Sequence, residues 1–246
     1  MRQALFIRSQ DRTVGSSTNF LLQLPKTYNN VRSYEVASAE IPFSWFNMSP
    51  PYLSGVTVTY AGSSMALTLP SGQYALSDLQ SQLLTALQAL FPAANFSAVN
   101  FTARTGQLSV SYTGGGTLSV ANNATGALGQ ILGTNATTTT TSSGTLTFPG
   151  YCQLFPTSTL LLNIQNLPPA VLCTNGLACS ARLQVGVAPS GVQLINNSTN
   201  SINFFQFPSP ISTLNQLTVL LQAADGSQLN LNGCEWSFCL LLEFDS

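Results

Sequence analysis

The stretch WSFCLLLEF (236–244) near the end of the chain decides the fold class, because its large apolar residues recur at every second position. One face would carry Trp236, Phe238, Leu240, Leu242 and Phe244. Successive side chains of a β-strand point to opposite faces of the sheet, so this period of two predicts a strand with one face in a core. We interpret it as a central strand rather than an edge strand.

Period-two alternation recurs along most of the chain. Asp225-Gly226 and Asn232-Gly233 are turn signals that precede the last strand, and Arg104–Gly106 is typical of a hairpin loop. The two prolines in 207–212 lack the N–H that a β-ladder needs, so we expect a connection or an edge there. The further predicted strands are 4–9, 18–24, 33–41, 56–60, 65–69, 96–103, 107–113, 159–164, 181–188, 202–207 and 215–223.

One segment has a helical period instead. Apolar residues at 76, 79, 83, 87 and 90 predict an α-helix over about 77–91, with Ser77 and Gln80 as a capping box and Pro92 just beyond its end. Many short strands with a single helix predict an all-β sandwich. A length of 246 residues suits one such domain over 1–246.

Two low-complexity stretches are assigned to loops. Residues 134–145 (TNATTTTTSSGT) carry no charge, and we expect an exposed polar loop or a strand shared with a neighbouring subunit. The glycine run at 113–117 (TGGGT) is expected to be a hairpin turn, because no helix N-terminus follows it to form a phosphate cradle.

Charge is scarce, with only 6% Asp, Glu, Lys and Arg and a formal net charge of -1. Copies of such a chain repel one another weakly, which favours a protein that packs against neighbours. Five of the seven basic residues lie in the first 32 positions, but they form no dense cluster, so no specific nucleic acid partner is expected. Arg8 interrupts the first apolar run, and no uncharged apolar stretch reaches 18 residues, so we expect a soluble cytosolic product with no signal peptide and no transmembrane segment.

The inventory of reactive side chains is short. The sequence has no histidine, which removes the usual general base and the commonest metal ligand. Its five cysteines lack the C-x2-C spacing of a zinc site, and their odd number favours free, mostly buried thiols. Nucleotide-binding and nucleophile motifs are absent, so no catalytic residue, cofactor or metal site is predicted.

Paired carboxylates are the remaining route to hydrolysis. Glu235 and Glu243 would lie roughly 26 Å apart along one strand, which is too far for a glycosidase pair. Glu35 and Glu40 differ by five positions, so in a regular strand they point to opposite faces. A hydrolase is therefore a weak alternative.

Aromatic residues leave a second alternative open. Trp45, Phe46, Tyr52 and Tyr74 could stack on sugars in a carbohydrate-binding or adhesin-like β-sandwich. The competing interpretation places the same rings in a core or an interface.

Residues 9–47 begin SQDRTVGSSTNFLLQLP and end EIPFSWFN, in the order of a strand ending in Asp-Arg, a Ser/Thr/Asn loop, a strand to Leu-Pro and a long strand into Glu-Ile-Pro. This arrangement resembles the single jelly-roll penton and minor capsid proteins of icosahedral double-stranded DNA viruses that also have double jelly-roll major capsid proteins. Similar pieces follow in the same order at 69–87, 101–120, 127–135 and 217–244.

The resemblance implies a single jelly-roll β-sandwich with one inserted helix and an N-terminal arm of about 15 residues. It implies a structural virion protein of the capsid, assembled in the host cell cytoplasm, and above all a penton that forms homopentamers at the fivefold vertices. Its partners would be copies of itself, major capsid protein capsomers and other minor capsid proteins. A minor capsid (cement) protein that joins capsomers is the alternative within the same group.

Asp11 and Arg12 stand out in a chain so poor in charge. We hypothesise a structural clasp, in which an ion pair or charge-assisted hydrogen bonds fix the path of the loop that leads into SSTNF (16–20).

Overall fold

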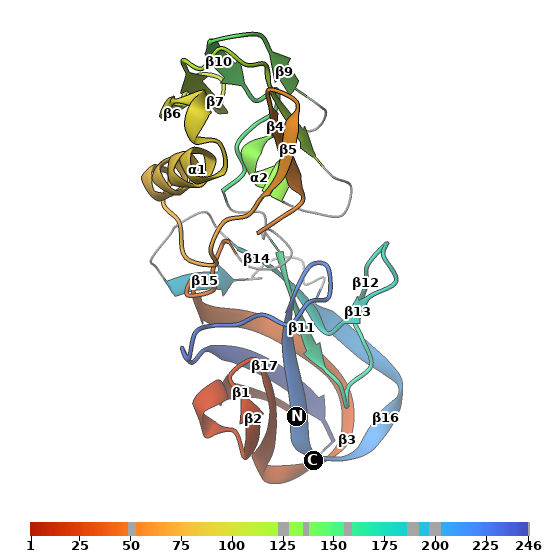
Figure 1. Ribbon diagram of the computed structural model, residues 1–246. Coiled ribbons are helices and arrows are strands. Elements are labelled where there is room, and N and C mark those ends of the chain that lie inside the picture. Colours follow the sequence, from red (N-terminus) through yellow and green to blue (C-terminus); the bar gives the residue numbers. More distant parts are fainter. Residues whose placement is uncertain are drawn as a thin grey trace. The chain divides into compact units, whose positions relative to one another are not determined.

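A computed structural model describes residues 1–48, 53–122, 128–134, 138–154, 159–185, 192–196 and 203–245, with the backbone alone at 138–139 and 192–196. The chain divides into two compact units (Figure 1). Unit 1 comprises Met1–Trp45 and Thr157–Ser246, and unit 2 is the continuous segment Phe46–Pro156 between them. This differs from the single domain expected over 1–246. Both units consist mainly of amphipathic strands, so the sequence pattern does not change where one core ends and the next begins.

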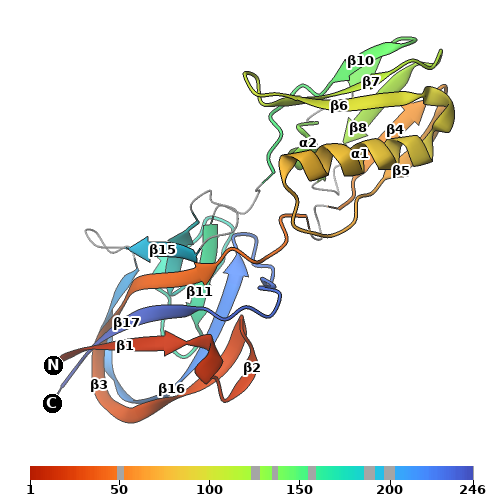
Figure 2. The ribbon, with the colours of Figure 1, turned by 90° about the vertical axis from the view of Figure 1, so that its left-hand side faces the viewer.

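Unit 1 is built on one antiparallel sheet of eight strands, ordered β1-β17-β3-β16-β11-β14, with β2 and β15 also paired to β3. Figures 1 and 2 show this sheet curling round on itself. A small hairpin of β12 (Val171–Leu172) and β13 (Ala178–Cys179) accompanies it. The sheet strands are β1 (Arg2–Arg8), β2 (Val14–Ser16), β3 (Asn19–Pro42), β11 (Thr159–Ile164), β14 (Ala181–Gln184), β15 (Val192–Asn196), β16 (Phe204–Ala223) and β17 (Ser237–Phe244).

The N-terminal segment is part of this sheet rather than an arm over its first 15 residues. β1 pairs with β17 along its whole length, and the 3-10 helix η1 (Ser9–Asp11) follows it directly. The alternation of Leu5 and Ile7 with exposed neighbours gives β1 one buried face, so the strand is held by core packing as well as by its ladder.

β3 is a single strand of 24 residues where the alternation predicts two. Its first half pairs with β2 and β16, and its second half with β15, β16 and β17. Asn30 has a φ of 50° at the junction, a left-handed conformation that asparagine tolerates better than most residues. The bend lets one strand serve both sides of the curled sheet.

The stretch 207–212 is not a connection, since it lies inside β16, but no described strand pairs with its first four residues, as expected for an edge. The register with β3 jumps between Gln206 and Ile211, so five steps on β16 oppose two on β3. Pro208 and Pro210 fall in that irregularity, where no ladder N–H is required.

The prediction for the closing stretch is confirmed. β17 lies between β1 and β3, and the predicted face is buried: Phe238, Leu240, Leu242 and Phe244 of β17, with Trp236 just before it. Asn232 and Gly233 have φ values of 50° and 81°, which fits the tight turn expected before this strand.

Unit 2 packs two small sheets and a helix around a separate core. One sheet has the order β5-β4-β8-β9 and the other β10-β7-β6. The helix α1 packs against β6 and places Leu79, Leu83 and Leu87 in the core, as its stripe predicts. The elements are β4 (Val56–Tyr60), β5 (Ser63–Leu67), α1 (Leu76–Leu90), η2 (Pro92–Ala94), β6 (Phe96–Thr102), β7 (Gln107–Tyr112), β8 (Leu118–Asn122), α2 (Leu128–Leu132), β9 (Thr138–Thr140) and β10 (Gly144–Thr147).

The helices of unit 2 differ from the sequence predictions at the N-terminus of α1 and by the presence of a second helix. The capping box of Ser77 and Gln80 is wrong: Asp78 accepts a hydrogen bond from the N–H of Ala75 at 3.0 Å, and the Gln80 amide donates to the carbonyl of Val99. The helix begins one residue earlier than predicted, so its acidic N3 position falls on Asp78. A second, short helix, α2, accompanies α1 in the described residues.

Two loop predictions in unit 2 also differ from the structure. The glycine run at 113–117 links β7 to β8, which belong to different sheets, so it is a crossing rather than a hairpin turn. Within 134–145, β9 pairs with β8 and β10 begins at Gly144 to pair with β7, while 135–137 lie outside the described residues.

Candidate functional site

The charged segment after β1 forms an elbow held by ion pairs. We call residues 8–12, with Glu235 and Trp236, the elbow. Arg8 donates from Nε and Nη2 to the two carboxylate oxygens of Asp11 at 2.7 and 2.8 Å. Both side chains are exposed, and hydrogen bonding to the Asp11 carboxylate raises the pKa of Arg8. This pair stabilises the 3-10 turn locally.

Within the elbow, Arg12 binds Glu235, which lies two residues before the last strand. Its Nη1 lies 2.8 and 2.7 Å from the two carboxylate oxygens of Glu235 and also donates to the carbonyl of Ser9 at 2.8 Å. Its Nε donates to the carbonyl of Gly15 at 3.1 Å. The side chains of Arg12 and Glu235 are 28% and 35% exposed, so solvent screens this pair less than the exposed Arg8–Asp11 pair.

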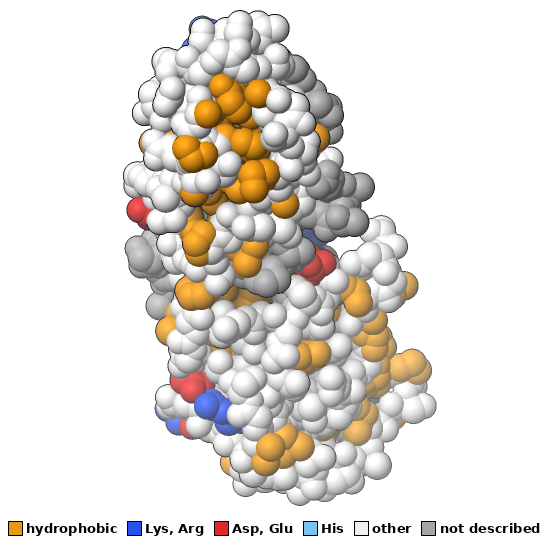
Figure 3. Space-filling model, viewed as in Figure 1, with side chains coloured by type: hydrophobic (Ala, Val, Ile, Leu, Met, Phe, Trp, Pro, Cys, Tyr) orange, Lys and Arg blue, Asp and Glu red, His pale blue; other side chains and the backbone are white. Residues whose placement is uncertain are grey.

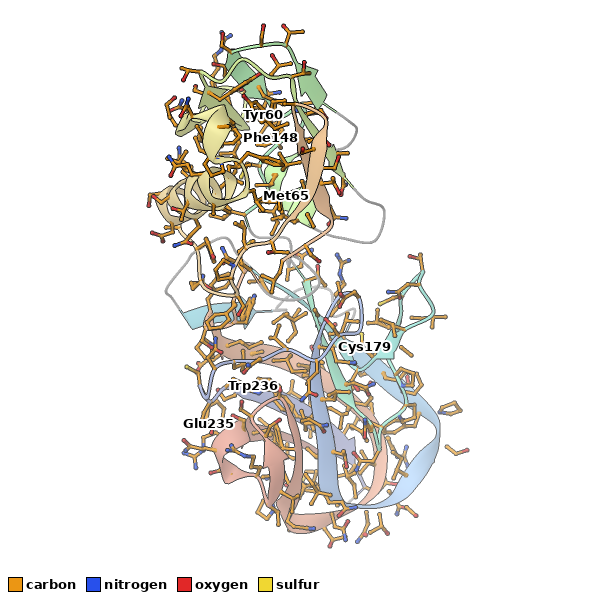
Figure 4. The ribbon with its side chains drawn as sticks, in the orientation of Figure 1. Tyr60, Met65, Phe148, Cys179, Glu235 and Trp236 are labelled. Atoms are coloured by element: carbon orange, nitrogen blue, oxygen red, sulfur yellow. The ribbon has the colours of Figure 1, made fainter. Side chains whose placement is uncertain are left out.

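Ser9 and Trp236 form the buried side of the elbow. The Ser9 hydroxyl donates to Glu235 at 2.5 Å and accepts from the backbone N–H of Trp236 at 2.9 Å. The indole N–H of Trp236 donates to the carbonyl of Ser17 at 2.6 Å, and its ring stacks on Phe238. Hydrogen bonding from Ser9, then from Arg12, lowers the pKa of Glu235 although burial opposes the shift. Glu235 and Trp236 lie side by side in Figure 4.

Asp11 and Arg12, the two residues of the predicted clasp, are both placed in the elbow but do not pair with each other. Asp11 binds Arg8, and Arg12 binds Glu235 and the carbonyls on either side of the turn. Arg12 contacts the carbonyls of Ser9 and Gly15, on both sides of the turn. That these contacts fix the path of the loop, and that the clasp matters for assembly, stay predictions. Sequence reasoning missed Arg8, although its i,i+3 spacing from Asp11 is a signal.

A hollow of about 500 Å3 opens beside the elbow. Its polar groups are hydroxyls, amides and the already paired Arg12 and Glu235. Such a set can bind by hydrogen bonding, but it offers no free base or nucleophile of adjusted pKa. The lining residues are Arg12, Ser16, Ser17, Thr18, Gln228, Leu229, Asn230, Gly233 and Glu235.

The prediction that Glu35 and Glu40 point to opposite faces is wrong. β17 pairs Leu241 with Glu35 and Ser237 with Glu40, but the register shifts by one residue of β3 between them. This bulge reverses the alternation and brings both carboxylates to one face. They pair with positions four residues apart on β17, roughly 13 Å at the rise of a strand, which exceeds the separation of a glycosidase pair.

The other acidic candidates also have partners. Glu35 binds Arg2 at 2.6 Å, and Glu243 accepts from the Ser33 hydroxyl at 3.0 Å. Arg32 forms a further ion pair with Asp245. In Figure 3 acidic and basic side chains gather in a small area low on unit 1, and most of the face shown is uncharged.

The aromatic residues considered as sugar platforms are mostly covered. Trp45 and Tyr74 are 4% and 6% exposed, and Phe46 is 39% exposed. Tyr74 is held by its backbone N–H and carbonyl, which bond to the buried side chain of Asn47. Tyr52 lies outside the described residues.

The described part of the chain holds free thiols but neither a metal-binding cluster nor a membrane-spanning helix. All five cysteines are free, but only Cys179 is buried and the others are half-buried, so the expectation of mostly buried thiols is wrong. No group of three or more Cys, Asp or Glu side chains there could hold a metal ion. None of the described helices is long and apolar enough to cross a membrane.

The fold of the chain is similar to that of a solved structure. A crystal structure of a selenomethionine-labelled mavirus penton protein matches with a TM-score of 0.55 at 11% sequence identity, and the match covers 99% of each chain. This chain has the fold of that penton protein. The predicted class, an all-β single jelly-roll sandwich with an inserted helix, is thereby confirmed as a fold. No family model and no curated protein matches the sequence.

Proposed function

We propose that this chain is a structural protein of an icosahedral double-stranded DNA virus, namely the penton that forms a homopentamer at each fivefold vertex. The observation that carries this proposal is the fold shared with the mavirus penton protein over 99% of both chains. A match across both units supports the proposal better than a likeness confined to one common sandwich, since a sandwich alone serves many functions.

The chemistry of the surface supports a role in assembly rather than catalysis. Four of the arginines, at positions 2, 8, 12 and 32, face carboxylates, and the net charge is -1. At these four positions, neighbours can cover the surface without burying an unpaired arginine. We propose that the chain is not an enzyme, and that its partners are its own copies, major capsid capsomers and other minor capsid proteins, in a virion assembled in the host cytoplasm.

A ring of five requires a heterologous contact, in which one surface meets a different surface of the next copy and the rotation closes. The test is native mass spectrometry of the purified full chain, followed by electron microscopy of the same sample. We expect a species at five times the 26.1 kDa mass of one chain, with fivefold class averages.

Three results would replace the proposal. A monomer that binds a glycan array favours the carbohydrate-binding or adhesin-like sandwich. Density of this chain beneath the capsomers of an assembled particle, and none at the vertices, favours the cement protein. Turnover of a glycoside or ester that is lost in Glu35→Gln or Glu40→Gln favours a hydrolase.

A further inference from the structure

The outer edge of β1 is an unused hydrogen-bonding surface. Met1 and Phe244 exchange both backbone hydrogen bonds, and the N–H of Ser9 donates to the carbonyl of Trp236 at 2.8 Å. In an antiparallel pair such residues alternate with residues that point away, so the even positions from Arg2 to Arg8 direct their N–H and C=O groups outward. In the part of the chain that the structure describes, no second strand pairs with β1.

The side chains along this edge are exposed as well. Phe6 is 62% exposed, which is unusual for a phenylalanine in a regular strand, and Ala4 beside it is also exposed. Phe6 pairs with Cys239 of β17 and Ala4 with Leu241. A long edge strand with an exposed aromatic residue is a template for adding another strand.

The opposite edge of the same sheet, β14, is capped at one residue. At β14 the buried amide of Asn203 accepts from the N–H of Arg182 at 2.9 Å and donates to its carbonyl at 3.4 Å. This side chain takes the place of a further strand at that residue. In the described part of the chain, no such side chain caps the outward groups of β1, so these groups are free to bind another strand.

We propose that the outer edge of β1 binds β1 of a second copy of this chain, antiparallel, about a twofold axis at Leu5. Arg2 then lies opposite Arg8 of the second copy, and Ala4 opposite Phe6. All four outward-directed residues of each strand are used, which gives about eight backbone hydrogen bonds since each such pair exchanges two.

The side chains fit this register. Each large Phe6 meets the small Ala4 of the second copy, and the two Phe6 rings are diagonal neighbours on one face, within reach of an aromatic contact. At each end, one Arg2–Glu35 pair meets one Arg8–Asp11 pair, so two cations meet two anions. The net charge of -1 leaves little repulsion between copies.

This contact is separate from the proposed pentamer. A twofold, isologous contact cannot close a ring of five, so the ring must use other surfaces. The twofold contact would cover an aggregation-prone edge in chains that are not yet incorporated.

The test uses sedimentation velocity of the full chain over a concentration series, with three variants. Ala4→Pro removes an outward N–H and leaves the ladder to β17 intact, Phe6→Glu places carboxylates against the facing strand, and Val14→Ala trims another exposed apolar side chain, on β2. We expect the first two variants to raise the dissociation constant of the twofold contact at least tenfold, and Val14→Ala to leave it within twofold. If Ala4→Pro does not fold, Phe6→Glu decides.

A second measurement identifies the register. The test mixes Ala4→Cys and Phe6→Cys chains that both also carry Cys239→Ser, because Cys239 faces position 6 within the same chain. Oxidation with glutathione disulfide should give a covalent heterodimer as the two thiols are converted to a disulfide and glutathione is reduced, because facing residues lie within disulfide reach. Each variant alone and the unaltered chain are the controls. The inference is overturned if sedimentation velocity detects no twofold contact at 100 μM, or if the mixture cross-links no more than the controls. A pentamer that forms normally in Ala4→Pro leaves the proposed function standing.

Discussion

The Arg12–Glu235 pair gives the sharpest prediction for the elbow, tested by a double-mutant cycle of Arg12→Ala and Glu235→Ala. Arg12 makes charge-assisted bonds to Glu235 and two carbonyls, and Glu235 also binds the buried hydroxyl of Ser9. Such bonds contribute about 1.5 to 3 kcal/mol when buried and under about 1 kcal/mol when exposed. With both side chains about one-third exposed, we expect each single change to lower the free energy of unfolding by about 2 kcal/mol, with a coupling of about 1 kcal/mol.

The assay is urea unfolding followed by tryptophan fluorescence. The sequence has two tryptophans, Trp45 and Trp236, and both belong to unit 1, so the signal reports that unit alone. Arg32→Ala is the matched control, because the Arg32–Asp245 pair is 57% and 43% exposed and should change stability by under about 0.5 kcal/mol. A coupling below about 0.3 kcal/mol for Arg12 and Glu235 would refute the reasoning.

The pH dependence follows from the lowered pKa of Glu235. The folded chain holds this carboxylate ionised at a pH where the unfolded chain has begun to bind a proton. The stabilisation is therefore complete above the ordinary value of 4.5 and is lost as the pH falls through the lower, folded value. The coupling should be equal at pH 7 and pH 5 and disappear only in more acidic solution. A coupling that fades between pH 7 and pH 5 would contradict this assignment.

Two further changes test local geometry. Gly15 has a φ of 108°, and an added Cβ would lie 2.2 Å from the carbonyl oxygen of Asn19. We therefore expect Gly15→Ala to lower the free energy of unfolding of unit 1 by about 2 to 3 kcal/mol, and Gly233→Ala, where the Cβ would enter open space, to lower it by about 1 kcal/mol. Equal losses in urea unfolding would disprove the steric argument. Burial raises the pKa of the Cys152 and Cys179 thiols to about 11. At pH 8, iodoacetamide should therefore modify both thiols about 100-fold more slowly in the folded chain than in the unfolded chain, because the thiolate is the reactive form. Peptide mass spectrometry measures both rates, and a folded rate within tenfold of the unfolded rate would rule this out.

The local elements with strong periodicity could be predicted from the sequence. The buried stripe of β17 and the Leu79, Leu83 and Leu87 stripe of α1 follow directly from periods of 2 and 3.6. In both cases the pattern depends only on neighbouring residues. The fold class followed because such strands dominate the chain.

Features that depend on distant pairing could not be predicted in this way. One extra residue in the middle of β3 reverses which side chains face outward. Its trace in the sequence is faint: the large apolar positions change from even numbers (Tyr34, Val36) to an odd number (Ile41), and only the small Ala39 marks the change between them. The junction at Asn30 joins two predicted strands into one because both halves find partners elsewhere in the chain. The division into two units also depends on which strands share a core.

In the elbow, the residues close together in sequence could be predicted, but the distant partner Glu235 could not. The rarity of charge singles out Asp11 and Arg12, and the spacing from Arg8 could have identified the partner of Asp11. Glu235 is 223 residues away from Arg12, so only the completed sheet brings the two together.

The placement of unit 2 between the two parts of unit 1 has a consequence for synthesis. Unit 2 is one continuous segment, so it can close its core soon after it leaves the ribosome, whereas β3 must wait for β16 and β17 at the far end of the chain. At 5 to 20 residues per second, the interval between the emergence of β3 and that of β17 is on the order of 10 to 40 seconds. During that time β3 has β2 as a partner already synthesised, but most of its length still lacks the β16 and β17 ladders that bury its apolar face in the finished sheet.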